Sequence, residues 1–145
     1  MLITGASSGI GRALAEHAAK EGARIALVAR RKAQLAEVAD RVRALGGEAH
    51  VLVCDVADRH DALSCTAKAN TLLGGIDVAI LNAGVGRHRT LVEHDLDDAE
   101  RMLRVNVLGA LYFAHALAPL MVARREGWMV FMASVAGLLP VPSEA

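Results

Sequence analysis

A stretch rich in glycine and serine, TGASSGIG (Thr4 to Gly11), follows a very short apolar segment and leads directly into a helical pattern. Glycines let the main chain turn tightly and approach a pyrophosphate, whose charge is attracted by the free N–H groups of a helix start. The spacing of Gly5, Gly9 and Gly11 differs from the common G-x-G-x-x-G fingerprint. By itself, the stretch indicates either a nucleotide site or a tight turn that merely joins a strand to a helix.

Four other polar residues stand where a side chain could act on a ligand. Asp55 and Asn82 each come at the end of an apolar run. Asn106 lies inside a long helical pattern, where asparagine is unfavourable, so we expect a distortion or a polar contact there. Ser134 stands just past an apolar run and could present a catalytic hydroxyl, or it could simply end a strand and begin a loop.

The elements that must position these residues alternate between short apolar strands and longer helical patterns. This alternation predicts a parallel sheet wrapped by helices. Strands are expected at residues 1–4, 24–29, 49–56, 77–84 and 128–134.

Four helices are expected between these strands. The first has Ile10, Leu14 and Ala18 on one face and is closed by Gly22, and the second has Leu35, Val38, Val42 and Leu45 before Gly46. The third begins at Asp58 and runs to Gly74, and the fourth is long and is capped by Asp95 or Asp97.

Composition limits the classes of function. The 145 residues are 54% hydrophobic, which suits one domain with a sizeable core. Sixteen basic residues balance sixteen acidic ones, so we expect neither nucleic-acid binding nor attachment to an anionic membrane. Cys54 and Cys65 form no CxxC pattern and are typical of a reducing cytosol.

The start of the chain also leads us to expect a cytoplasmic location. The start of the chain, MLITGASSGIG, has no basic region and turns polar after four residues, unlike a signal peptide. Residues 105–123 carry no charge and approach the length of a membrane span. We reject that interpretation because Asn106, His115 and Pro119 interrupt the stretch, which lies within the alternation of strands and helices.

Five short motifs occur in order along the whole chain: TGASSGIG (4–11), CDV (54–56), NAG (82–84), VNVLG (105–109) and ASVAG (133–137). In order and spacing they resemble those of the short-chain dehydrogenase/reductase family. The resemblance implies an α/β fold of the Rossmann type, with a doubly wound parallel sheet of about five strands and helices on both faces. Residues 1–145 would form a single NAD(P)-binding domain, incomplete at its C-terminal end, that acts on a small alcohol or carbonyl substrate.

The resemblance also implies the cofactor contacts. Asp55 would accept a hydrogen bond from the adenine amino group, and Val56 would pack on the ring. Asn82, Ala83 and Gly84 would lie at the edge where open α/β sheets bind ligands, although the family's usual asparagine doublet is here Leu81-Asn82. Along the phosphates would lie Gly5, Ser7, Ser8, Gly9, Ile10 and Gly11.

The choice of cofactor depends on the end of the second strand. Relatives that prefer NAD place an acid there to hold both ribose hydroxyls. This chain instead has Ala29, then Arg30 and Arg31, whose guanidinium groups suit bidentate contact with a 2′-phosphate. We therefore expect NADP rather than NAD, the alternative being that both arginines are solvated residues at a helix start.

For catalysis, the resemblance assigns Asn106 to the asparagine whose backbone holds a water in a proton relay. It assigns Ser134 to the serine that donates a hydrogen bond to the substrate oxygen. The family's tyrosine and, four residues later, its lysine would come about a dozen residues after Ser134, just beyond Ala145. The only tyrosine, Tyr112, has Ala116 where the lysine would stand, and we expect it in the core or an interface. We expect a fragment with negligible turnover alone.

The sequence also leads to expectations about metals and partner subunits. None of the six histidines has metal-ligand spacing, so no metal is expected. The long helix, around residues 97–124, is apolar on opposite faces, and in relatives the second face packs on a twin subunit, so we expect a homo-oligomer. Arg87, His88 and Arg89 form either a basic loop at the site mouth or plain surface.

Two other hypotheses remain at this point. A catalytically silent NADP(H)-binding module or redox sensor would bind the cofactor tightly without turnover. A methyltransferase could also contain a glycine-rich turn of this kind, and S-adenosylmethionine would then stabilise the fold instead of NADPH.

Overall fold

The computed structural model describes residues 1–86 and 95–137. Its centre is a parallel sheet with the strand order β3-β2-β1-β4-β5. The predicted doubly wound α/β fold is confirmed. The strands are β1 (Leu2–Thr4), β2 (Arg24–Ala29), β3 (Glu48–Val53), β4 (Val78–Leu81) and β5 (Trp128–Phe131).

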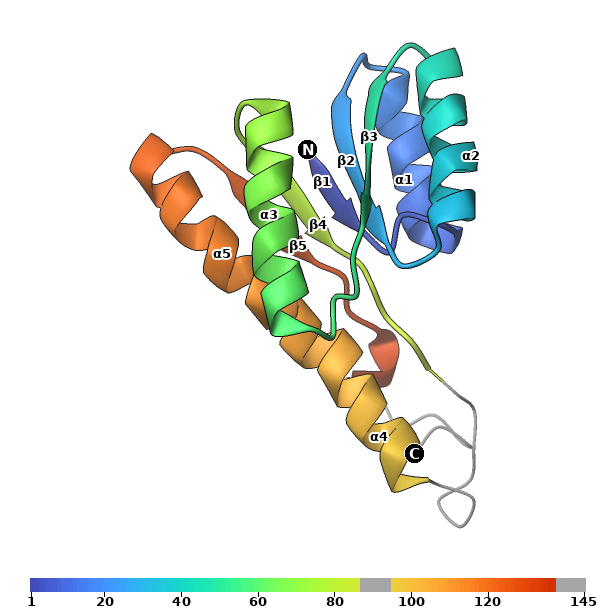
Figure 1. Cartoon of the computed structure of the whole chain (residues 1–145), viewed down its shortest axis with the longest axis vertical. Coiled ribbons are helices and arrows are strands. Elements are labelled where there is room, and N and C mark those ends of the chain that lie inside the picture. The colour runs from blue at the N-terminus through green and yellow to red at the C-terminus, as the bar shows by residue number, and fades with distance from the viewer. Residues whose placement is uncertain (87–94, 138–145) are drawn as a thin grey trace.

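Helices cover both faces of this sheet (Figure 1). One face is covered by α1 (Gly9–Ala19) and α2 (Lys32–Ala44), and the other by α3 (Arg59–Leu73) and the long helix. The long helix comprises α4 (Leu96–Leu103), the π-helical segment η2 (Arg104–Leu108) and α5 (Gly109–Arg124). A 3-10 turn, η3 (Val135–Gly137), follows β5.

The order of the strands reverses direction at β1. β1 pairs with β2 on one side and with β4 on the other, so the chain crosses from one half of the sheet to the other between β3 and β4. Open parallel sheets bind ligands in the crevice beyond the carboxyl ends of the strands at this switch point. The expected site is therefore beyond Thr4 and Leu81.

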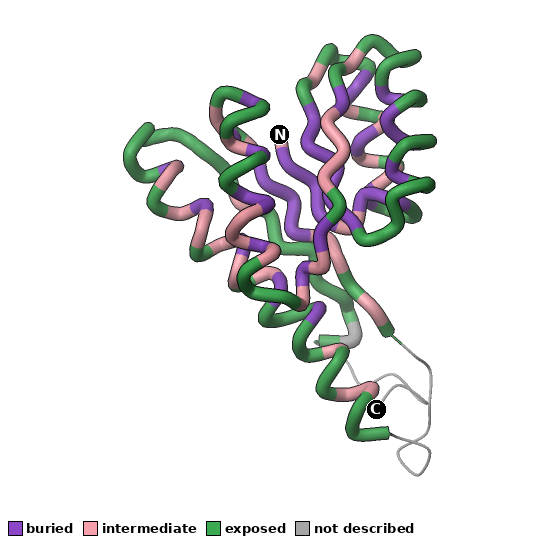
Figure 2. The backbone as a smooth tube through the Cα atoms, in the orientation of Figure 1, coloured by how far each residue is buried: buried purple, intermediate pink, exposed green. Residues whose placement is uncertain are grey.

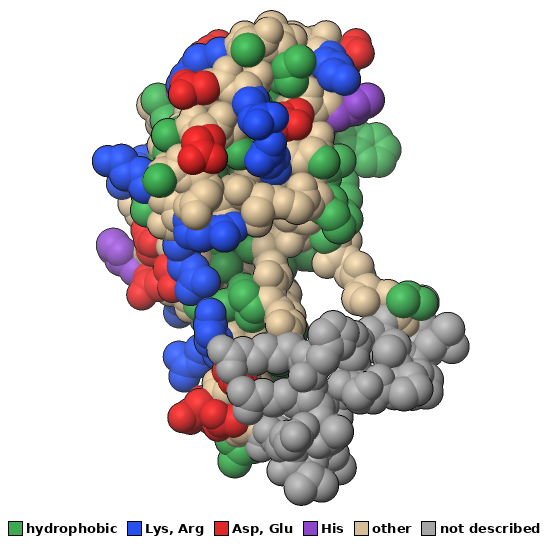
Figure 3. Space-filling view, turned by 90° about the vertical axis from the view of Figure 1, so that its right-hand side faces the viewer, with side chains coloured by type: hydrophobic (Ala, Val, Ile, Leu, Met, Phe, Trp, Pro, Cys, Tyr) green, Lys and Arg blue, Asp and Glu red, His purple; other side chains and the backbone are tan. Residues whose placement is uncertain are grey.

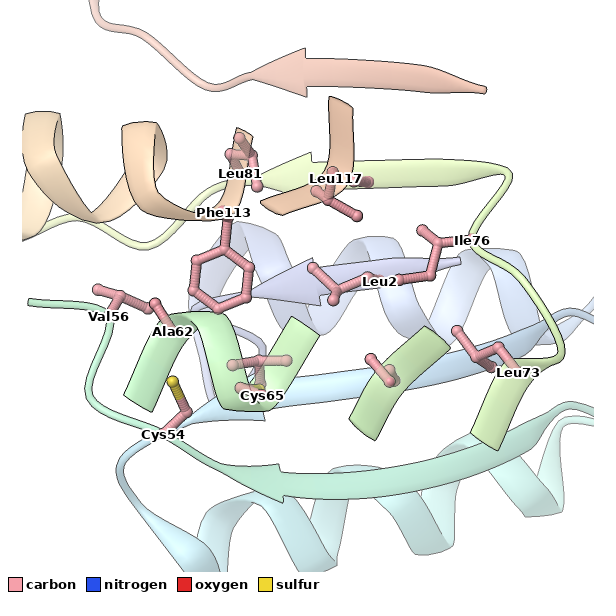
Figure 4. Packing of buried hydrophobic residues seen from close by; sticks show 14 of the residues in the cluster. Leu2, Cys54, Val56, Ala62, Cys65, Leu73, Ile76, Leu81, Phe113 and Leu117 are labelled. Carbon is pink, nitrogen blue, oxygen red and sulfur yellow. The ribbon is translucent and has the colours of Figure 1, made fainter. Parts of the chain in front are cut away.

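Two apolar cores lie on the two faces, because successive residues of a strand point in opposite directions. Leu2 packs with Phe113 and Leu117 in the core beneath α3 and α5 (Figure 4), whereas its neighbour Ile3 packs with Leu35 and Val38 beneath α1 and α2. Figure 2 shows the buried strands at the centre of the molecule. All of β2 except Arg24 is buried, as its continuous apolar run predicts.

Capping residues begin and end the helices largely as expected. The carboxylate of Asp58 accepts a hydrogen bond from the backbone N–H of Asp61 at 2.7 Å, and Gly74 ends α3 in the left-handed conformation. Of the two candidate caps for the long helix, Asp95 accepts from the backbone N–H of Asp97 at 3.0 Å.

The buried face of α1 differs from our prediction. Gly11, Ala15 and Ala19 are buried, whereas Ile10 is 60% exposed at the edge of the helix. The stripe that packs on the sheet consists of the smallest residues and lies one position after the predicted one. In the second helix the predicted face is correct except at its end, where Leu45 is exposed.

The long helix buries one stripe and exposes another. Every fourth residue from Val105 to Met121 is buried, and α5 packs against α3. By length and apolar composition alone, Leu96–Arg124 could cross a membrane, since its most apolar stretch of 18 residues has a mean hydropathy of 1.6, and 28% of that stretch is buried. Leu103 and Leu111 remain exposed on it, as does Trp128 on β5.

The face that carries α1 and α2 is mixed in charge. Lysine, arginine, aspartate and glutamate side chains are interspersed there, and hydrophobic side chains gather toward one edge (Figure 3).

Candidate functional site

A cavity of about 610 Å³ lies at the switch point, beyond the carboxyl ends of β1 to β4. Its wall comes from the four connections that begin where these strands end, together with Val105 of the long helix. Every residue predicted to contact the cofactor lines it, with the exception of Gly11: Gly5, Ser7, Ser8, Gly9, Ile10, Arg30, Arg31, Asp55, Val56, Asn82, Ala83 and Gly84.

The glycines of the first connection have distinct physical roles. Gly5 and Gly9 have φ angles of +68° and +55°, in the left-handed region that glycine adopts without a Cβ penalty. A Cβ on Gly9 would meet no protein atom within 4 Å, so the backbone there lies open to the cavity. A Cβ on Gly11 would lie 2.5 Å from the carbonyl oxygen of Gly5 and 2.7 Å from Nδ2 of Asn82. Gly11 therefore does not line the cavity; its lack of a side chain lets α1 approach the sheet.

The start of α1 offers backbone N–H groups to this cavity. Ser8 is the N-cap residue in extended conformation, and within the described chain no side chain accepts from the first N–H groups of the helix. The first turn contains no acidic residue. An uncapped helix start with its positive dipole end at a cavity is suited to an anion such as phosphate.

Arg31 bridges the first and second connections. Its Nη2 donates to the hydroxyl oxygens of Ser7 and Ser8 at 2.8 and 2.6 Å, and its Nε donates to Ser7 at 3.2 Å. The guanidinium group is therefore held over the glycine-rich turn by two hydroxyls, and no carboxylate is paired with it among the described residues. Arg30 differs, because its Nη1 lies 3.8 Å from Oδ2 of Asp55.

Asp55 is held in place by its neighbours at the end of β3. Its backbone N–H donates to Oδ2 of Asp61 at 2.7 Å, and its own Oδ1 accepts from the backbone N–H of Ala57 at 3.1 Å. Val56, the next residue, is buried against Gly109, where a Cβ would lie 3.0 Å from the Val56 carbonyl oxygen. The glycine of the VNVLG motif thus permits α5 to approach the wall of the cavity.

Thr4, which was not predicted as a site residue, connects β1 to the NAG turn. Its hydroxyl is buried, accepts from the backbone N–H groups of Asn82 at 2.9 Å and Ala83 at 3.0 Å, and lies 3.4 Å from the Ile80 carbonyl as a donor. Nδ2 of Asn82 donates in return to the Thr4 carbonyl at 3.1 Å. The sequence signal that could have indicated this role is a polar residue at the end of an otherwise apolar strand.

Asn106 shows the distortion and the polar contact that its position in a helix led us to expect. It lies in the π-helical segment η2, where the regular hydrogen-bond ladder is interrupted. Its Oδ1 accepts from the backbone N–H of Val85, and its Nδ2 donates to the Val85 carbonyl, both at 2.8 Å. Asn106 therefore fixes the segment after the NAG turn. Val85 lines the cavity and was not predicted.

Ser134 lies beyond β5 and is not part of the cavity wall. It is exposed, and its carbonyl accepts from the backbone N–H of Gly137 at 3.1 Å. Tyr112 is partly buried against the core beneath α3 and α5, as predicted. Arg87, His88 and Arg89 lie outside the described residues. In residues 1–86 and 95–137, no three His, Cys, Asp or Glu side chains gather as a metal site would require.

The fold is a doubly wound α/β fold with a cavity at its switch point, and comparison with known proteins gives the family. The short chain dehydrogenase family model matches residues 1–145. An uncharacterized oxidoreductase of Listeria monocytogenes is 36% identical over 145 residues, which are 100% of this chain and 58% of that protein. This chain belongs to the short-chain dehydrogenase family.

Solved structures agree with this assignment. A xylitol dehydrogenase with bound NAD+ superposes with a TM-score of 0.94 at 33% identity, covering 99% of this chain and 55% of that one. A metagenomic short-chain oxidoreductase in complex with NADP gives a TM-score of 0.93 at 32% identity, covering 99% and 66%. The chain spans about half the length of the curated relatives it matches.

Proposed function

We propose that this chain forms the cofactor-binding part of an NADP(H)-dependent oxidoreductase that interconverts an alcohol and a carbonyl compound. The cofactor supplies hydride when bound. The residues present suit such a group, because an open glycine backbone, an uncapped helix start and two arginines line one cavity. Family membership supports the reaction class.

The bridge from Arg31 to Ser7 and Ser8 is the observation that supports NADP over NAD. The two solved relatives hold different cofactors, NAD+ in one and NADP in the other, so the choice depends on this chain's own residues. A guanidinium group fixed just after β2, where residues 29–31 carry no acid, offers two donors to a 2′-phosphate. Since hydroxyls are weaker partners than a phosphate, the ligand can displace them.

For proton transfer, we propose roles for two residues of this chain. Ser134 would donate a hydrogen bond to the substrate oxygen, and the backbone of Asn106 would hold a relay water. The chain has one tyrosine, Tyr112, which packs against the core and has no lysine four residues later. Without a positioned acid, the rate falls by about 10²–10⁴-fold, so we propose that the chain alone binds cofactor with negligible turnover.

The long helix is the proposed contact with a second copy. Leu103, Val107 and Leu111 remain exposed on it while its other stripe is buried. An apolar stripe of this kind marks an interaction surface. Sedimentation of the whole protein as a strict monomer at micromolar concentration would contradict this part of the proposal.

The experiment for the proposed function is a fluorescence titration of the purified chain with NADPH, followed by an assay of NADPH oxidation with a panel of carbonyl compounds. We expect saturable binding and no turnover above background. Robust oxidation by this chain would overturn the assigned need for an external acid. No binding of NADPH or NADH would overturn the function itself.

A further inference from the structure

Two cysteines meet at the wall of the cavity. Cys54 follows β3 and lines the cavity, and Cys65 lies on α3, one turn after Asp61. Both are buried members of the core beneath α3 and α5, and neither is in a disulfide. Figure 4 shows the sulfur of Cys54 pointing toward α3, beside Cys65. The Cys54 thiol is also the neighbour that acts most strongly on the pKa of Cys65, and the reverse holds for Cys54.

We propose that Cys54 and Cys65 are an oxidisable dithiol that closes to a disulfide when a hydroperoxide enters the cavity, and that bound cofactor blocks this entry. The first half stands on the cysteine pair alone. The second half rests on the proposed cofactor function, because it requires a ligand at the adenine end, beside Asp55 and Val56.

The environment of the pair divides the two thiols into different roles. The Cys54 thiol beside it, acting as a donor, lowers the pKa of Cys65. The Cys65 sulfur, followed by burial and the nearby Asp61 carboxylate, raises the pKa of Cys54. Cys65 therefore loses its proton first, and its thiolate can then take the proton of Cys54.

The oxidation is balanced as follows. As Cys54 gives its proton to the Cys65 thiolate, the Cys54 sulfur attacks one oxygen of hydrogen peroxide, so that an S–O bond forms, the O–O bond breaks and hydroxide leaves. The Cys65 sulfur then attacks the Cys54 sulfur, forming the S–S bond, and its proton joins the departing second hydroxide as water. The sulfurs lose two electrons in total, and the two thiol protons end in two waters.

Closing the bond would move the segment that is expected to hold the adenine. A disulfide requires the sulfurs to approach to about 2.05 Å. Cys65 is fixed in the middle of α3, whereas Cys54 begins the connection that ends at the cap Asp58. Residues 54–57 would therefore take up the displacement, and Asp55 and Val56 would shift with Cys54.

The sequence allows a direct readout. Trypsin cleaves after Arg43, Arg59 and Lys68, so Cys54 and Cys65 fall in adjacent peptides, 44–59 and 60–68. After exposure of the folded chain to hydrogen peroxide, we expect these peptides to be joined, with the loss of two hydrogen atoms, and to separate on reduction. Cys54→Ala and Cys65→Ala should give no joined peptide, and absence of the link in the wild-type chain would overturn the proposal.

Protection by cofactor is measured with NADP+, which is not itself a reductant. At ten times its dissociation constant, the rate of cross-linking should fall about elevenfold if only the free chain reacts. An unchanged rate at saturation would overturn the blocking role. If a separate titration shows that NADP+ does not bind, the proposed function fails and the blocking role with it, while the peptide link still decides the dithiol.

A second measurement uses only the wild-type chain, so it tests the proposal even if the cysteine variants do not fold. Iodoacetamide labelling of the wild-type chain should modify Cys54 before Cys65, since only Cys54 lines the cavity, and NADP+ should slow it. Labelling of Cys65 first, or labelling of both only after global unfolding by urea, would contradict entry of the reagent through the cavity.

Discussion

The side-chain amide of Asn106 pairs with both backbone groups of Val85, at 2.8 Å in each direction. One end of the pair lies in the π-helical segment of the long helix, and the other follows β4 and lines the cavity. A residue that is unfavourable inside a regular helix thus connects the helix to the cavity wall. This gives Asn106 a structural role in addition to any role of its backbone in catalysis.

Replacing Asn106 with leucine should lower both stability and NADPH affinity. Loss of two hydrogen bonds costs about 1–3 kcal/mol in the free energy of unfolding, because each contributes about 0.5–1.5 kcal/mol. Urea denaturation measures the first effect and NADPH titration the second. Arg104→Gln is the control, since Arg104 lies in the same segment, is exposed and makes only a long ion pair with Glu100, at 3.9 Å. Equal stability and affinity of the two variants would contradict the role of the pair.

Thr4→Val should destabilise the protein much more than Thr66→Val. Both threonines are buried, but the Thr4 hydroxyl is the acceptor for two backbone N–H groups, whereas the Thr66 hydroxyl only donates to the Ala62 carbonyl in its own helix. Valine at residue 4 would leave the N–H groups of Asn82 and Ala83 unsatisfied, at about 1–3 kcal/mol each. Urea denaturation of the two variants provides the comparison, and similar losses would show that the Thr4 hydroxyl does not hold the turn.

The ion pair between Asp77 and Arg124 predicts a pH dependence of stability. A hydrogen bond from Arg124 lowers the pKa of Asp77, which is therefore below its unfolded value. Such a carboxylate stabilises the fold above the unfolded pKa of about 3.9, and this contribution disappears as the pH falls through the folded pKa. Asp77→Asn should thus be less stable than wild type at pH 6, and the difference should shrink below about pH 4.

The effect will be small, because the Asp77 side chain is 62% exposed and solvent screens the pair. Urea unfolding at pH 6, 4.5 and 3 tests it. Asp40→Asn serves as the control, since it removes the same charge from an exposed ion pair, with Arg43, elsewhere on the surface. A stability difference between Asp77→Asn and wild type that stays constant down to pH 3 would contradict the assignment.

The fold was largely predictable from apolar periodicity, and its errors have physical causes. β2 was predicted with its observed bounds because both of its faces are buried and its residues are continuously apolar. The buried face of α1 was misplaced because its contact residues are Gly11, Ala15 and Ala19, which carry little hydrophobic signal. Close approach of a helix to a sheet requires small side chains, so this packing face is weakly marked in the sequence.

The ends of the strands were predicted too long for a related reason. Residues 54–56, 82–84 and 132–134 follow β3, β4 and β5 and include apolar or small residues beside Asp55 and Asn82, but ladder pairing stops before them. The first two of these segments line the cavity. Their sequence reflects contacts in the core and the site rather than pairing in the sheet.

The members of the site were predictable, but the contacts that hold them were not. The glycine-rich turn and the arginines were visible as motifs. The role of Thr4 depends on backbone groups 78 residues away, and that of Asn106 on a backbone 21 residues away. Such pairings exist only once the sheet has brought the segments together.

The claim that this cavity binds NADP(H) through Arg31 is tested most directly by comparing NADPH and NADH affinity in the wild-type chain and in Arg31→Met. A hydrogen-bonded charge contributes about 1.5–3 kcal/mol, so the substitution should weaken NADPH binding by at least about tenfold while leaving NADH nearly unchanged. Lys20→Met, which removes the same charge at an exposed position after α1, should change neither. Tighter binding of NADH than NADPH by wild type, or an equal loss for both cofactors in Arg31→Met, would contradict the account.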